Sequence, residues 1–211
     1  MANINLRVVD LFHLDTVTSL QQAAESGIWG IIHKATTGAT GTDGQYANRR
    51  QAALDAGLLW GAYHWGTNAD VDDQVDNFLT VAQPDAAVLV ALDFEETSGN
   101  QMTLDQAREF LTKVAQQLGR KPVLYCGGLF KSEMGSQRDA FFGSHRLWLA
   151  QYGSNPEPQA SWDSIWLWQY TDSTTGLQPN QVPGIPGDAS GNLDCNSYEF
   201  TKEQLTGEWA S

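Results

Sequence analysis

Short apolar runs alternate with amphipathic segments along the first 126 residues, and this order predicts repeated strand–helix units. The expected strands are Leu6–Phe12, Trp29–Lys34, Leu58–Trp65, Ala87–Phe94 and Pro122–Cys126. The expected helices between them are Ser19–Ser26, Gln45–Ala56, Val71–Val81 and Leu104–Leu118. Strands that alternate with helices run parallel, because each crossover returns the chain to the same end of the sheet. The pattern therefore predicts an α/β fold built on a parallel sheet or barrel.

The segment after Thr103 has the clearest helix signals. Thr103 and Gln106 have the spacing of a capping box, and Gly119 follows the last apolar position of a single stripe. Residues 87–92 are apolar without interruption, which is typical of a strand buried on both faces of a parallel sheet. Both segments support the strand–helix interpretation.

The rhythm changes after residue 127. Leu147–Tyr152 and Ile165–Tyr170 are strand-like, but the segment between them is rich in Pro, Ser and Asn and does not predict a helix. Residues 171–191 contain three Pro and four Gly, which predicts a long turn-rich excursion or a hairpin. A short helix near Lys202–Trp209 is expected at the end. No linker or repeat interrupts the chain, so residues 1–211 are interpreted as one domain.

Charge and hydropathy exclude several classes of partner. The 25 Asp and Glu against 12 Lys and Arg give a net charge of -13, which phosphate backbones and anionic membranes would repel. We therefore expect neither a nucleic-acid nor a membrane partner. The N-terminal residues lack the basic and apolar regions of a signal peptide, and no apolar run approaches the length of a membrane span. A target outside the cell would be reached by release, by another delivery system, or after removal of a leader.

Cysteine and histidine usage gives no sign of a metal or cofactor. Cys126 and Cys195 lack a metal-binding spacing and are too few for a disulfide framework, so we expect free thiols. The histidines are His13, His33, His64 and His145, and none forms a zinc-type pair in sequence. His64 is expected to be a hydrogen-bonded strand-end residue rather than a ligand contact. No G-x-S-x-G, G-x-G-x-x-G or Walker-type motif occurs, which disfavours hydrolase-fold esterases and nucleotide enzymes.

Carboxyl groups gather where the strands of a parallel barrel would end. Asp10 lies near the end of the first strand, and Asp93 and Glu95 lie at the end of the fourth. Because side chains alternate along a strand, Asp93 and Glu95 should share one face, with Cβ atoms roughly 6–7 Å apart. Burial and a neighbouring like charge both raise the pKa of a carboxyl, so such a pair suits glycoside hydrolysis. The alternative is a pair of solvated strand-end or helix-capping groups.

Aromatic side chains are frequent near the same strand ends. They are Tyr63, Trp65, Tyr125, Trp148, Tyr152, Trp166, Trp168 and Tyr170. Flat rings suit the C–H faces of sugars, and tyrosine hydroxyls or an amide such as Gln169 suit sugar polar groups. Alternation places Tyr63 and Trp65 on one face of their strand and His64 on the other. The aromatic residues predict a carbohydrate cleft, and the alternative for each ring is packing between barrel and helices.

Eight stretches of the chain carry a family resemblance: Val9–Leu11, Ile31–Thr36 with Gly38, Ala56–Trp65, Leu92–Glu96, Pro122–Tyr125, Leu147–Tyr152, Trp168–Thr171 and Leu193–Asn196. In this order along the chain, they resemble the glycoside hydrolase family 25 lysozymes, the Chalaropsis-type N-acetylmuramidases of bacteria, fungi and phages. The resemblance implies a single domain folded as a flattened TIM-like (β/α)5β3 barrel. It also implies hydrolysis of the β-1,4 bond between N-acetylmuramic acid and N-acetylglucosamine in bacterial peptidoglycan, without metal or cofactor.

The resemblance further implies roles for individual residues. Glu95 is expected to be the general acid and Asp93 its partner, with Asp10 and Asp194 completing an acidic ring. The expected substrate-binding residues are Lys34, Tyr63, Trp65, Tyr125, Trp148, Tyr152, Gln169 and Tyr170. The D-x-E arrangement resembles that of hexosaminidases in which the 2-acetamido group of the substrate attacks the anomeric carbon. This retaining route is favoured over inversion, in which Asp93 or Asp10 would activate a water.

Two departures from the family pattern stand near the expected groove. Thr37 occupies a position where many members have Glu, and Leu11, Phe12 and His13 follow Asp10 in place of a small residue and Ser. We expect no separate cell-wall-binding domain, and we expect a monomer. Two other functions stay open: a catalytically silent carbohydrate-binding barrel, and a glycosidase acting on another N-acetylated polymer such as chitin.

Overall fold

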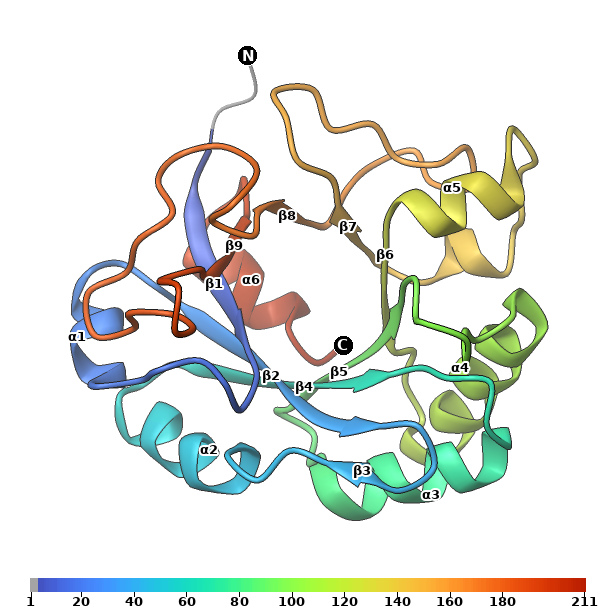
Figure 1. Cartoon of the computed structure of the whole chain (residues 1–211), viewed down its shortest axis with the longest axis horizontal. Coiled ribbons are helices and arrows are strands. Elements are labelled where there is room, and N and C mark those ends of the chain that lie inside the picture. The colour runs from blue at the N-terminus through green and yellow to red at the C-terminus, as the bar shows by residue number, and fades with distance from the viewer. Residues whose placement is uncertain (1–3) are drawn as a thin grey trace.

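The computed structural model describes residues 4–211, which form a closed β-barrel surrounded by helices (Figure 1). The sheet runs in the order β1-β9-β8-β7-β6-β5-β4-β2-β3, and a β1–β2 pairing closes it. The barrel strands are β1 (Leu6–Leu11), β2 (Gly30–Thr37), β4 (Leu59–Trp65), β5 (Leu89–Phe94), β6 (Val123–Cys126), β7 (Leu147–Ala150), β8 (Leu167–Thr171) and β9 (Asp194–Ser197). The short strand β3 (Gly41–Thr42) pairs antiparallel with β2 outside the barrel.

The helices follow the strands in the predicted alternation. They are α1 (Leu20–Glu25), α2 (Tyr46–Asp55), α3 (Val71–Ala82), α4 (Leu104–Leu118), α5 (Gly128–Met134) and α6 (Lys202–Glu208). Figure 1 shows α1 to α5 arranged around the outside of the strands. Helix α4 has the predicted bounds, and Thr103 and Gln106 form the predicted capping box. The TIM-like α/β barrel is thus confirmed, with β3 and α5 as additions too short for sequence periodicity to indicate.

Strand β9 departs from the parallel pattern. Successive pairs from β1–β2 to β7–β8 are parallel, whereas β9 is antiparallel to both β8 and β1. The connection between β8 and β9 contains turns and isolated bridges in place of a crossover helix, so the chain re-enters the barrel at the end where β8 leaves it. Asp194 therefore begins β9 at this end, paired in register with Asp10 of β1.

The buried side chains form two layers, because alternate residues of each strand face the barrel interior or the helices. The interior layer contains Val8, Ile32, Leu89, Ala91, Val123, Trp148 and Leu167. The outer layer lies between the strands and the helices and includes Phe78, Phe94, Phe110 and Phe130. At the end where the parallel strands finish, polar side chains line the interior, among them Asp10, Asp93 and Gln169.

Several residues have the structural roles that the sequence predicts. His64 is buried in the outer layer, with Nδ1 2.7 Å from Thr36 Oγ1 and Nε2 3.1 Å from Gln74 Oε1. Cys126 and Cys195 are free and buried. Among residues 4–211, no helix combines the length and apolar character needed to span a bilayer.

Candidate active site

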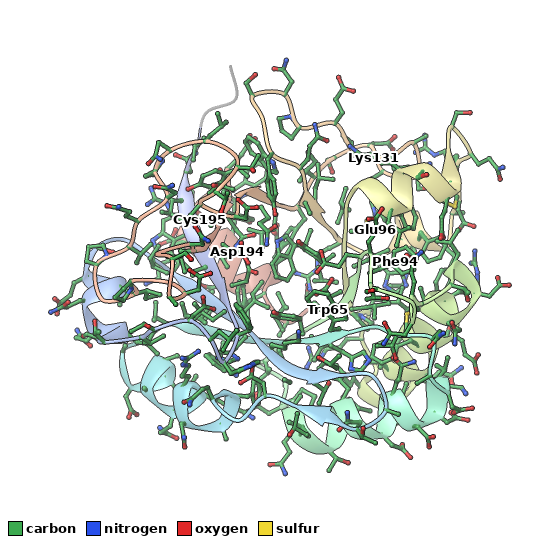
Figure 2. The ribbon with its side chains drawn as sticks, in the orientation of Figure 1. Trp65, Phe94, Glu96, Lys131, Asp194 and Cys195 are labelled. Carbon is green, nitrogen blue, oxygen red and sulfur yellow. The ribbon has the colours of Figure 1, made fainter. Side chains whose placement is uncertain are left out.

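A cavity of about 300 Å³ lies at the carboxyl ends of the parallel strands. It is lined by Asp10, Phe12, Lys34, Tyr63, Trp65, Asp93, Glu95, Tyr125, Trp148, Tyr152, Gln169, Asp172 and Asp194. Two of these residues, Trp65 of β4 and Asp194 of β9, are labelled in Figure 2. All the site residues predicted from the sequence line this cavity except Tyr170.

The position of Tyr170 corrects the prediction that it lines the site. Its side chain is fully buried in the outer layer, and its hydroxyl donates a hydrogen bond to the carbonyl oxygen of Pro179. Gln169 and Tyr170 are neighbours on β8, so their side chains face opposite sides of the barrel wall. Gln169 faces the cavity, and the aromatic ring of Tyr170 packs beside Trp168 at a centroid distance of 5.8 Å.

Sequence reasoning missed Phe12 and Asp172 as lining residues. Phe12 belongs to the loop after β1, where its backbone N–H donates to Asp15 Oδ2 at 2.7 Å. Arg49 of α2 donates to the carbonyl oxygen of Phe12 at 2.7 Å, so the loop is held from both sides. Asp172 directly follows β8, and its position at the carboxyl end of a parallel strand is the signal that would have found it.

The two carboxyls at the end of β5 share one face, as predicted. Asp93 and Glu95 both face the cavity, whereas Phe94 between them packs in the outer layer at a centroid distance of 6.1 Å from Phe130. Asp93 is only 4% exposed, and its Oδ1 has no hydrogen-bond partner among the described residues. A buried acceptor without a partner is unfavourable until a proton or a ligand satisfies it. Oδ1 of Asp93 is therefore available for a hydrogen bond with a bound molecule.

Burial and mutual repulsion raise the pKa values of the cavity carboxyls. Burial raises the pKa of Glu95 from 4.5 to about 7, with the charge of Asp10 adding to the shift and Lys34 opposing it. Burial also raises the pKa of Asp93 well above its usual range, and repulsion from Glu95 adds to the rise. The pKa of Asp194 is raised by burial and by Asp10. A carboxyl with a pKa near 7 retains a transferable proton at near-neutral pH, as a general acid requires.

Lys34 is the one basic residue among those that line the cavity. Lys34 Nζ lies 3.9 Å from the centroid of the Trp65 ring and 6.0 Å from that of Tyr63, a cation–π arrangement. Burial lowers the pKa of Lys34, and the charges of Asp93 and Glu95 oppose this change. Lys34 therefore supplies positive charge on the β2 side of the acidic pair.

Two amides hold the remaining predicted carboxyl, Asp10. Gln169 Nε2 donates to Asp10 Oδ1 at 3.2 Å and to Oδ2 at 3.1 Å. Asn196 of β9 donates to Asp10 Oδ2 at 2.7 Å. Burial raises the pKa of Asp10 to about 6, and both amide hydrogen bonds oppose the rise by favouring the ionised form. Asn196 was not predicted as part of the site, because its contact with Asp10 depends on how β9 closes the barrel.

The donor set does not indicate a metal centre. Within residues 4–211, no group of three His, Cys, Asp or Glu side chains is arranged to hold a metal ion. The cavity instead combines a potential proton donor in Glu95, an Asp93 oxygen without a hydrogen-bond partner, and aromatic walls. These groups suit acid-assisted cleavage of a sugar polymer.

Comparison with known proteins adds independent information. The family model described as glycosyl hydrolases family 25 matches residues 9–177. The autolytic lysozyme of Clostridium acetobutylicum is 28% identical over 204 residues, which is 96% of this chain and 58% of that protein. The uncharacterized protein YegX of Escherichia coli K12 is 28% identical over 178 residues, which is 82% of this chain and 60% of that protein. The chain thus spans about three fifths of the length of these curated relatives.

Solved structures share the fold over nearly the whole chain. The bacterial lysozyme from Streptomyces coelicolor has a TM-score of 0.84 at 20% identity, with 99% of each chain covered. The muramidase from Trichobolus zukalii has a TM-score of 0.80 at 24% identity, covering 98% of this chain and 99% of that one. Because the family model also matches most of the sequence, from the first barrel strand to beyond β8, this chain belongs to glycosyl hydrolases family 25.

Proposed function

We propose that this protein is a lysozyme, an N-acetylmuramidase that hydrolyses the β-1,4 bond between N-acetylmuramic acid and N-acetylglucosamine in bacterial peptidoglycan. The observation that carries the proposal is the pair formed in the cavity by the partly buried Glu95 and the buried Asp93. Glu95 has a pKa of about 7, and Asp93 keeps an unpaired oxygen beside it. The similarity to an autolytic lysozyme over most of the chain supports the choice of substrate.

In the proposed mechanism, Glu95 donates its proton to the glycosidic oxygen as the bond to the anomeric carbon breaks. The carbonyl oxygen of the substrate's own 2-acetamido group attacks that carbon and forms a cyclic oxazolinium intermediate. Asp93 Oδ1 accepts the acetamido N–H, which orients the amide. The positive charge that develops on this amide lowers the pKa of Asp93 and favours its ionised form, which in turn stabilises that charge. Water then adds to the anomeric carbon while Glu95 takes up a proton, so the product retains its configuration.

The surroundings of Asp10 and Asp93 favour this route over inversion. An inverting enzyme needs a carboxylate base that holds a water on the opposite face of the sugar. Both oxygens of Asp10 already accept hydrogen bonds from Gln169 and Asn196, which makes Asp10 a weak candidate for that base. Asp93 is almost fully buried on the same face as Glu95, which suits direct contact with the substrate amide.

We further propose action at the cell wall as a monomer, since an enzyme that works along a polymer needs an open groove. The aromatic walls of the cavity would pack against the sugar rings. The residues that form these walls are Tyr63, Trp65, Tyr125, Trp148 and Tyr152.

The test is digestion of purified peptidoglycan, followed by borohydride reduction and mass spectrometry of the fragments. Glu95→Gln removes the proton donor at nearly constant volume and is expected to lower turnover by at least about 10²-fold. Glu96→Gln removes the neighbouring exposed carboxylate and serves as the matched control, with activity near that of wild type. Fragments that end in reduced muramic acid, formed by wild type and Glu96→Gln but not by Glu95→Gln, would support the proposal.

Other outcomes point to the remaining functions. Fragments ending in reduced glucosamine would mean that a different bond is cut, and Glu95→Gln activity within about tenfold of wild type would contradict the general-acid role. Release of fragments from chitin but not from peptidoglycan would identify the other N-acetylated polymer as substrate. No release from either polymer would favour a silent carbohydrate-binding barrel. Proton NMR of new reducing ends separates retention, in which the β-anomer appears first, from inversion.

A further inference from the structure

Asp10 accepts hydrogen bonds from two side-chain amides, those of Gln169 and Asn196, whose nitrogen and oxygen atoms are all hydrogen-bonded within the protein. Gln169 is 2% exposed and Asn196 is fully buried, so neither amide meets bulk solvent. The two side chains direct three N–H contacts at the Asp10 carboxylate, at distances of 2.7–3.2 Å. An ionised carboxylate only accepts hydrogen bonds, so this arrangement matches the charged form of Asp10.

The carbonyl oxygens of both side-chain amides also have hydrogen-bond partners. Gln169 Oε1 accepts hydrogen bonds from the hydroxyls of Tyr125 and Tyr152, each at 2.9 Å. Asn196 Oδ1 accepts one from the indole N–H of Trp148 at 2.6 Å. The indole N–H only donates, so it requires Asn196 to turn its NH₂ group towards Asp10, and the NH₂ group of Gln169 also points to Asp10. Gln169 is therefore fully engaged within the protein, which argues against the direct substrate contact expected from the sequence.

The charge on Asp10 acts on Glu95. Asp10 is the strongest of the neighbouring charges that raise the pKa of Glu95, and Lys34 is the charge that opposes it. The other titratable groups that line the cavity around this pair are Tyr63, Asp93, Tyr125, Tyr152, Asp172 and Asp194. Asp15, in the loop after β1, lines a neighbouring cavity, and Asp194 lines both cavities. A neutral Asp10 would leave Glu95 with less repulsion and a weaker hold on its proton.

We propose that Asn196 and Gln169 are positioning residues that keep the Asp10 carboxylate ionised and fixed in the cavity, so that its negative charge holds the proton on Glu95. The proposal rests on the proposed function, because it assigns these amides to the general acid of that reaction. It gives the two amides an indirect role in which neither touches the reacting atoms.

The two amides act on Glu95 through the charge of Asp10. Burial raises the pKa values of both carboxyls, and the charge of Asp10 raises that of Glu95 further. Removal of an amide donor raises the pKa of Asp10, because the ionised form loses a hydrogen bond. The pKa of Glu95 then falls, because its neighbour carries less charge.

The experiment compares Asn196→Leu and Gln169→Met with the matched control Gln159→Met. Gln159 is a buried amide in the loop after β7 that donates to the carbonyl oxygens of Gly135 and Gln137, so its loss gives a similar packing defect outside the cavity. Carboxyl ¹³C NMR titration reads the pKa values directly, with Asp10→Asn and Glu95→Gln assigning the resonances. The pH profile of kcat/KM on peptidoglycan is measured alongside.

In Asn196→Leu and Gln169→Met, we expect the pKa of Asp10 to rise by about one unit and that of Glu95 to fall, with the alkaline limb of kcat/KM moving to lower pH. In Gln159→Met both pKa values and the profile should match wild type. Unchanged pKa values of both groups in the two cavity variants, or equal shifts in Gln159→Met, would overturn the proposal. A shift of Asp10 without any change in Glu95 would also overturn it.

The NMR titration separates this proposal from the proposed function. It needs no turnover, so it reports on Asp10 and Glu95 even in a protein that cleaves no peptidoglycan. A wild type without muramidase activity would contradict the proposed function while the titration still decides whether the amides control the two carboxyls.

Discussion

Glu95→Gln tests the electrostatics of the site through stability, without any substrate. Folding raises the pKa of Glu95 from 4.5 to about 7, chiefly through burial. Between these values the folded protein binds a proton that the unfolded chain has already lost, so the Glu95 carboxyl favours folding at low pH. This contribution is fully present below about pH 4.5 and is lost as the pH rises through about 7. Above pH 7 the folded protein carries a buried charge that the glutamine variant lacks.

The size of the effect follows from the pKa difference. A rise from 4.5 to about 7, at about 1.4 kcal/mol per pH unit, corresponds to at most about 3 kcal/mol at pH 8. The side chain is only partly buried, so solvent screening makes this figure an upper bound. For a protein of this length, 1 kcal/mol shifts the melting temperature by roughly 2–4 °C. Glu95→Gln is therefore expected to melt up to about 6–12 °C above wild type at pH 8.

The assay is calorimetric melting of wild type, Glu95→Gln and Glu96→Gln from pH 4.5 to pH 8. The increase in melting temperature of Glu95→Gln over wild type should be small at pH 4.5 and should grow as the pH passes through about 7. The melting temperature of Glu96→Gln relative to wild type should not change in this way. Burial lowers the pKa values of His33 and His64 to about 4, and these groups titrate in every variant, so the difference between variants isolates Glu95. A gain that is constant with pH, or a lower melting temperature than wild type at pH 8, would refute the reasoning.

Two further predictions concern charge and backbone conformation. Lys34→Met removes the charge that lowers the pKa values of Asp93 and Glu95, so the alkaline limb of kcat/KM should move up by about one pH unit, and an unchanged or lower limb would contradict this role. Gly184→Ala places a Cβ against the carbonyl oxygen of Ser19 at a φ of +84°, whereas Gly99→Ala meets the same φ with no atom within 4 Å. Urea denaturation should show a loss of about 1–2 kcal/mol for Gly99→Ala and a clearly larger loss for Gly184→Ala, and equal losses would rule out the predicted clash.

Local patterns in the sequence were sufficient to predict much of the barrel and of its acidic pair. The two-residue period of a strand placed Asp93 and Glu95 on one face and Phe94 on the other, as the structure confirms. Alternating strands and helices placed the carboxyl ends of the strands at one end of the barrel, so that the side chains located there were expected to meet. Helix α4 was predicted as Leu104–Leu118, between the cap Thr103 and the stop Gly119, because its capping and periodic signals are all local.

The same local signals failed where position depended on distant segments. The resemblance implied that both Gln169 and Tyr170 line the site, but neighbours on a strand face opposite sides, and barrel closure decides that Gln169 is the interior one. Asn196 meets Asp10 across 186 residues of sequence, because β9 runs antiparallel beside β1. The pKa values of Glu95 and Asp10 likewise depend on burial and on neighbouring charges from several strands.

The amino-acid sequence alone therefore determined which residue types lie at the strand ends and which of them share a face, since these depend on the repeat of the covalent backbone. The tertiary structure decided which carboxyls are paired, which are left without a partner and which keep a proton. Those properties arise from desolvation and hydrogen bonds between segments that come together only when the barrel closes.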